Sequence, residues 1–162
     1  MNRKQILGVV VGGILLFLWS GLAQSLLPWG VPSVQEATNA AEIGAAIAAT
    51  TEDGMLYIEA PVAAYVAVKP ASYYNLTRYF TIEFITQLLV AAVLMAILVL
   101  TRGLSVGQRV GLVALVALAG IASIDLQYWN WWGFSTIYSV GFAVNRLIGY
   151  LIAGGVLARF FV

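Results

Sequence analysis

The sequence predicts an all-α membrane protein: a bundle of four transmembrane helices with a small insert outside the membrane between the first two. Of the 162 residues, 62% are hydrophobic and 9% are charged, whereas a soluble domain has about a quarter of its residues charged. The chain also holds four apolar runs of roughly 20 residues, the length that a helix needs to cross about 30 Å of hydrocarbon. We therefore expect a single integral membrane domain, residues 1–162, with spans at about 5–27, 79–100, 110–126 and 137–160 and an extracytoplasmic insert at about 30–78.

Charge and composition exclude several classes of function. The net charge is +1, so no basic surface is expected to attract nucleic acid. The chain has no cysteine and no histidine, which removes thiolate nucleophiles, imidazole bases and the usual ligands of haem, zinc and iron–sulfur clusters. We expect no metal site, no cofactor and no nucleic-acid partner.

The first apolar run follows Arg3 and Lys4 and continues over residues 5–27. It is longer than the roughly 7 to 15 residues of a signal-peptide core, so it is predicted to be a transmembrane helix. The predicted end is Pro28-Trp29, because proline stops a helix and tryptophan prefers the membrane interface.

The insert is predicted to contain a short helix and a hairpin. Ser33 followed by Glu36 fits a capping box, and an alanine-rich run to Thr50 favours a helix. Residues 55–60 and 63–68 are β-branched and aromatic, which is typical of two short strands. A hairpin alone is only marginally stable in water, so we expect it to cover the outer ends of the helices as a lid.

The basic residues predict the orientation of the bundle. Four spans place Arg3, Lys4, Arg102, Arg109 and Arg159 on one side. By the positive-inside rule that side is cytoplasmic. Both termini are then predicted inside, with the insert and a tryptophan-rich turn after the third span outside.

Three ionisable residues lie inside the predicted spans or at their edges: Glu83, Asp125 and Arg146. Counting along the helices places Glu83 roughly 6 Å and the Arg146 Cα roughly 13 Å below the outer boundary. A helical side chain leans towards the N-terminus of its helix, so the Arg146 guanidinium is expected to reach the level of Glu83. Asp125 is the second candidate partner of Arg146.

The other polar residues of the spans fall in the same outer half, notably Gln24, Gln87 and Asn145. Charged and polar groups inside a membrane usually face protein or water. One interpretation is a pocket with a polar floor beneath the hairpin, suited to the headgroup of a lipid or quinone. The other is that these groups satisfy one another and fix the register of the helices.

Two further patterns allow both a packing and a binding interpretation. Gly141, Gly149 and Ala153 follow the spacing of four residues that lets helices approach closely, either within the bundle or against another subunit. Aromatic residues that suit the membrane interface form either a simple belt or a platform that grips a lipid, a pigment or a partner; they are Trp29, Tyr128, Trp129, Trp131 and Trp132. Asn130, within this cluster, is expected to cap the turn or bond the lid backbone.

The residues Tyr128-Trp129-Asn130-Trp131-Trp132-Gly133-Phe134 lead into the last span at Asn145-Arg146-Leu147-Ile148-Gly149. Together with Leu27-Pro28-Trp29, this pattern resembles an uncharacterised family of small bacterial four-helix inner-membrane proteins. The resemblance implies a bacterial inner-membrane location and a strand pair between the first two spans, but no activity. After Trp29, relatives often have histidine where this chain has Gly30-Val31.

No catalytic Ser–Lys pair, close carboxylate pair, phosphate loop or metalloprotease motif is present in the sequence. We therefore expect a protein that is not an enzyme. The first hypothesis is an accessory or structural subunit of a larger membrane complex, or a homo-oligomer, in contact with lipids and neighbouring proteins. The alternative is a protein that binds or transports a lipid-like or quinone-like amphiphile through the outer polar pocket.

Overall fold

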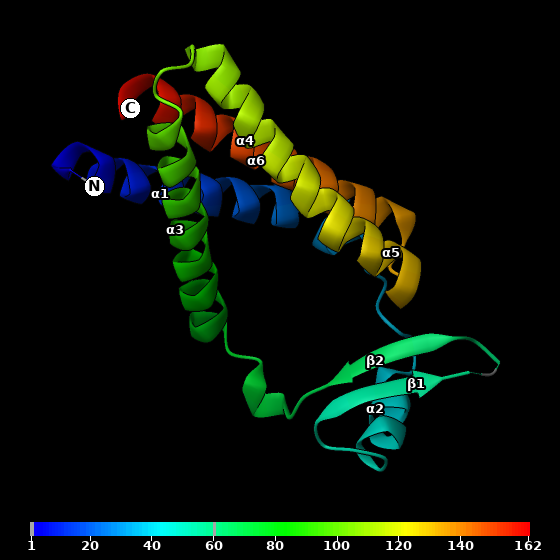
Figure 1. Cartoon of the computed structure of the whole chain (residues 1–162). Helices are drawn as coiled ribbons and strands as arrows, with labels where there is room; N and C mark the ends of the chain where they lie inside the picture. Colours follow the sequence, from blue (N-terminus) through cyan, green and yellow to red (C-terminus); the bar gives the residue numbers. More distant parts are fainter. Residues whose placement is uncertain (1, 60) are drawn as a thin grey trace.

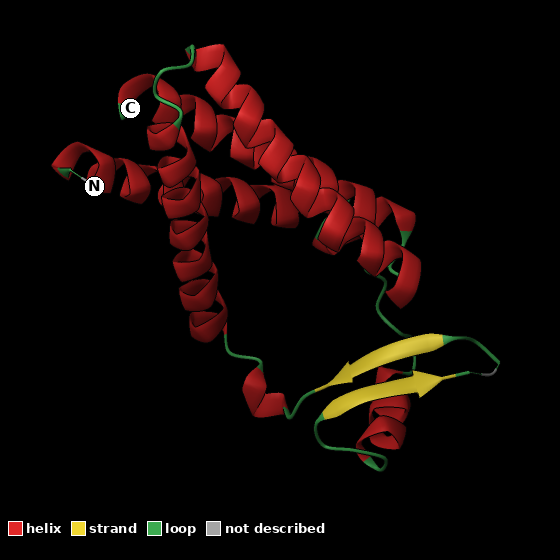
Figure 2. Cartoon of the chain, in the orientation of Figure 1, coloured by secondary structure: helices red, strands yellow, loops and turns green. Residues whose placement is uncertain are grey.

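The computed structural model describes residues 2–59 and 61–162, and it is mostly helical (Figure 2). Four stretches are long and apolar enough to cross a membrane, which confirms the prediction of four candidate spans. The long helices in them are α1 (Arg3–Leu26), α3 (Leu76–Leu100), α4 (Val106–Gly120) and α6 (Thr136–Phe160).

Side-chain caps fix where these helices begin. Asn2 and Ser105 each form a capping box with a glutamine three residues later, at the starts of α1 and α4. Asn75 and Ser135 accept a hydrogen bond from a backbone N–H in the first turns of α3 and α6. Each cap satisfies backbone donors that have no partner within the helix.

The third span continues past its predicted end at residue 126. After α4, a π-helical segment, η3 (Ile121–Asp125), passes directly into α5 (Leu126–Trp132). The prediction of a tryptophan-rich turn was therefore wrong, because the tryptophans lie on a helix. The turn begins at Gly133, where φ is +70°, a left-handed conformation that ends helices and suits glycine.

The insert contains the predicted hairpin and a shorter helix than expected. Ser33 does not start a helix as predicted: its hydroxyl donates to the carbonyls of Trp29 and Gly30, and the α-helix begins only after Asn39. The two strands pair antiparallel with Tyr57 opposite Tyr65, which confirms the hairpin. The elements are η1 (Val31–Ser33), α2 (Ala40–Ala48), β1 (Gly54–Ile58), β2 (Ala64–Val68) and η2 (Ala71–Tyr73).

The insert lies beyond the ends of α1 and α5, to one side of the helices (Figure 1). Its hairpin meets them at Tyr65, whose ring centroid is 5.2 Å from that of Trp132. No residue of α2 is buried, and none is buried in the two strands. The hairpin therefore does not close over the bundle as the expected lid would.

The helix α3 packs tightly against its neighbours in one half of the bundle only. At the crossing of α1 and α3, a Cβ atom on Gly13 would lie 3.1 Å from the Leu88 Cα, so the glycine allows close approach of the backbones. Beyond this crossing, Leu94 and Leu98 of α3 are buried against Leu157 of α6.

The buried residues of α3 all fall within residues 91–98. The outer half of the helix, which begins at Leu76, therefore has no buried residue. In Figure 1 this half of α3 diverges from α1 and α6. The divergence leaves the polar residues of α3 facing an open cleft.

Candidate functional site

A cleft of about 1020 Å³ lies between α1, α3 and α6 in this open half. It brings together six polar residues that the sequence places in the outer half of the spans. They are Ser20, Gln24, Glu83, Gln87, Asn145 and Arg146.

Glu83 is held by two neutral donors. Its Oε1 accepts hydrogen bonds from the Ser20 hydroxyl at 3.2 Å and from the Gln87 side-chain amide at 2.7 Å. Within residues 2–59 and 61–162, the ion pairs join Lys69 to Asp53 and Arg146 to Asp125. The Glu83 carboxyl group therefore has no cationic partner in this part of the chain.

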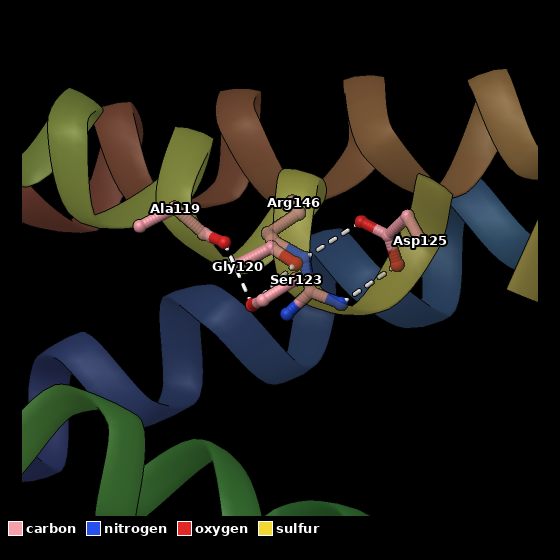
Figure 3. Close-up of polar contacts among 5 residues, drawn as sticks. All are labelled: Ala119, Gly120, Ser123, Asp125 and Arg146. Atoms are coloured by element: carbon pink, nitrogen blue, oxygen red, sulfur yellow. Dashed lines mark hydrogen bonds and ion pairs between the residues drawn. The ribbon is translucent and has the colours of Figure 1, made fainter. Parts of the chain in front are cut away.

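Arg146 pairs with Asp125, the second candidate, rather than with Glu83. The guanidinium donates from Nε to Asp125 Oδ2 and from Nη2 to Asp125 Oδ1, both at 2.9 Å (Figure 3). Asp125 is buried, with a side chain that is 5% exposed. This two-pronged geometry is the strong form of an arginine–carboxylate pair.

The π-helical segment presents Asp125 to Arg146. The Leu126 N–H bonds the Ile121 carbonyl, five residues earlier, and such a widened turn shifts the faces on which the following side chains lie. Gly120 makes room beside it, since a Cβ atom there would lie 3.3 Å from the Arg146 Cδ. The Ser123 hydroxyl donates to the Ala119 carbonyl at 2.7 Å in the same turn (Figure 3). Sequence reasoning missed this turn.

Asn145 lies at the same level as Glu83. Its backbone carbonyl accepts from the Trp19 indole N–H at 3.0 Å, and the next residue of α1, Ser20, bonds Glu83. Asn145 is only 6% exposed, and its side-chain Oδ1 has no hydrogen-bond partner among the described residues. A buried amide oxygen without a donor is energetically unfavourable.

Aromatic residues and one cation frame the mouth of the cleft. The Arg78 guanidinium lies 4.0 Å from the centre of the Tyr73 ring, and Tyr79 lines the same region. Sequence analysis did not single out Arg78, although its position beside the start of the second span was visible.

The small residues of α6 pack inside the bundle. A Cβ atom on Gly141 would lie 2.2 Å from the Trp29 Cβ, and one on Gly149 would lie 2.9 Å from the Trp19 ring. Ala153 is fully buried. These positions serve the α1–α6 contact.

The predicted aromatic platform is divided between three locations. Trp29 packs on Gly141, as described above, and Trp132 packs against Tyr65 of the hairpin. Trp129 and Trp131 on α5 donate their indole N–H groups to Thr136, at the start of α6, and to Gln127 of α5. Asn130 is exposed, and among the described residues its side chain makes neither of the expected hydrogen bonds.

A second, smaller hollow of about 340 Å³ adjoins the ion pair. Tyr128, Tyr138 and Phe142 line it, together with the buried Ser139. Phe142 and Arg146 border both hollows, so Arg146 separates the cleft from an aromatic compartment that the sequence did not predict.

No protein-family model, curated protein or solved structure matches the chain. In the described ranges, no three Asp or Glu side chains come together where they could hold a metal ion. The chemistry of the cleft therefore rests on its carboxyl, amide, hydroxyl and guanidinium groups.

Proposed function

We propose that this chain is a non-catalytic, multi-pass membrane protein that binds an amphiphile in the cleft between α1, α3 and α6. The observation that carries the proposal is the divergence of α3, which leaves Glu83 and Gln87 lining a cleft instead of buried between helices. Polar groups at membrane depth are costly unless they meet other polar groups. A lipid-like or quinone-like headgroup would supply them.

The apolar lining of the cleft suits the tail of such a ligand. Leu18 and Leu22 line the cleft and are 57% and 54% exposed, and Phe80 faces it from α3. In a bilayer these side chains would contact hydrocarbon. A ligand could then keep its tail among lipid chains while its headgroup reaches Ser20 and Glu83.

Filling the cleft tests this proposal. Gly21 lines the cleft, and a Cβ atom there would have nothing within 4 Å, so Gly21→Leu should fold normally and obstruct the ligand. We expect it to lower amphiphile binding at least about tenfold, since tenfold corresponds to about 1.4 kcal/mol, as measured by quenching of tryptophan fluorescence with brominated lipids. Gly155→Leu is the matched control, because Gly155 also has open space but lies outside the cleft. Equal binding by both variants would contradict the proposal.

We further propose that the chain lies in a bacterial inner membrane with both termini in the cytoplasm. The support is the positive-inside rule, the even number of candidate spans and the position of both termini at one end of the bundle (Figure 1). The sequence resemblance to uncharacterised four-helix inner-membrane proteins belongs to the same proposal.

Single cysteines can test this orientation, because the chain has none of its own. Gly44 in α2 and Gly103 between α3 and α4 are exposed, with nothing within 4 Å of an added Cβ atom. We expect a membrane-impermeant maleimide to label Gly44→Cys in intact spheroplasts and Gly103→Cys only after lysis. The opposite pattern would reverse the proposed orientation.

A second proposed function is that of an accessory subunit in a larger membrane complex or a homo-oligomer. Gly107 and Gly111 lie one turn apart on α4, both are exposed, and neither has an atom within 4 Å of an added Cβ. Such a surface allows another helix to approach closely. We expect Gly111→Leu to shift the protein to a smaller species in native gels after mild-detergent extraction, with Gly155→Leu as the control.

A further inference from the structure

We infer that the headgroup bound in the cleft carries a protonated amine, which pairs with Glu83 and donates to Asn145. This inference rests on the proposed amphiphile binding and specifies its ligand. It follows from the charges and the unsatisfied acceptors at one level of the bundle.

The charge at this level is unbalanced. Both Arg146 donors described above are committed to Asp125, so the pair is neutral as a whole. Glu83 has only the neutral donors of Ser20 and Gln87. An ionised carboxyl group at membrane depth favours a cationic partner, and a cationic headgroup would supply it.

The nearest cation along α3 does not fill this role. Arg78 precedes Glu83 by five residues, which separates them by about 7.5 Å along the helix axis, and its guanidinium lies over the Tyr73 ring at the mouth. Arg78 makes no ion pair with Glu83 in the described ranges. In the described ranges, the carboxyl group of Glu83 is therefore without an ion-pair partner.

Two acceptor oxygens at this level have no donor among the described residues. Both bonds to Glu83 go to Oε1, which leaves Oε2 without a described donor, and the buried Asn145 Oδ1 has none either. An ammonium group has three donors and no acceptor, so its chemistry matches acceptors of this kind. A phosphate or carboxylate headgroup would instead add acceptors and like charge beside Glu83.

Brominated amphiphiles of one chain length test the inference in purified protein in nanodiscs: an alkylamine, an alkanol and an alkanoate. The signal is the quenching of Trp19, which lines the cleft, taken as the quenching that Trp19→Phe removes. We expect the amine to bind at least about tenfold more tightly than the alkanol, as for about 1.4 kcal/mol of charge-assisted bonding, and the alkanoate to bind most weakly.

Two variants isolate the charge. Glu83→Gln retains the size of the side chain and should reduce amine binding to the level of alkanol binding, whereas Glu42→Gln in the exposed helix α2 should change neither. Asn145→Asp adds a second carboxyl group at the same level and should strengthen amine binding selectively.

Equal binding of amine and alkanol, or amine binding unchanged in Glu83→Gln, would overturn the amine assignment and leave the proposed function standing. Absence of Trp19 quenching by every probe would overturn the proposed function itself.

Discussion

Replacing Arg146 with methionine is expected to destabilise the protein by about 3–5 kcal/mol, because it leaves the buried Asp125 without its partner. Adding Asp125→Leu to this variant should recover most of the loss, since an apolar pair of similar size leaves no uncompensated charge. Unfolding in detergent, followed by tryptophan fluorescence, measures both effects.

The exposed pair of Lys69 and Asp53 provides the control for this prediction. Its side chains are 38% and 59% exposed, and exposed ion pairs contribute about 0–1 kcal/mol. Lys69→Met should therefore change stability by less than about 1 kcal/mol. If Arg146→Met had an equally small effect, or if the double variant were no more stable than the single one, the buried pair would not hold the outer half of the bundle together.

Adding one methyl group at Gly141 is expected to displace Trp29. The new Cβ atom would lie 2.2 Å from the Trp29 Cβ, well inside van der Waals contact, so Trp29 must move away from α6 together with its backbone. We expect Gly141→Ala to destabilise the protein by about 1–3 kcal/mol, as overpacked cores do, and to shift tryptophan emission as the environment of Trp29 changes.

Gly155 on the same helix is the matched position for this experiment. Nothing lies within 4 Å of its added Cβ atom, so Gly155→Ala should leave stability unchanged or raise it by up to about 1 kcal/mol through helix propensity. Removing the Trp29 Cβ as well, in Gly141→Ala with Trp29→Gly, should remove the clash, so the two changes should be coupled rather than additive. Simple additivity would show that Gly141 and Trp29 do not act through direct contact.

Features set by local composition could be predicted from the sequence. The four apolar helices follow from runs of apolar residues, and the hairpin follows from two β-branched segments. Counting residues also placed Glu83 and Asn145 in the same outer half of the spans, and the structure brings both to one cleft.

Features set by small geometric differences could not be predicted in the same way. The choice of Asp125 over Glu83 as the partner of Arg146 depends on one widened turn, which leaves no pattern in composition. The helical path of the tryptophan stretch was missed because aromatic residues suit an interface in a helix or a turn alike. The divergence of α3 depends on how closely it crosses α1 at Gly13, a tertiary contact that hydropathy does not encode.

The close crossing at Gly13 defines the point about which α3 would rotate if its angle to α1 changed. Leu88 lies at this crossing, and Leu76, the first residue of α3, is twelve residues or about 18 Å away along the helix. A rotation of about 5° at this crossing would move that end by roughly 1.6 Å, given the rise of a helix per residue. Leu94 and Leu98, six and ten residues on the other side of the crossing, would move by roughly 0.8 Å and 1.3 Å. A change in the crossing angle that widened the cleft mouth would therefore also shift the buried residues Leu94 and Leu98, so the packing of the buried half of the bundle fixes the width of the cleft.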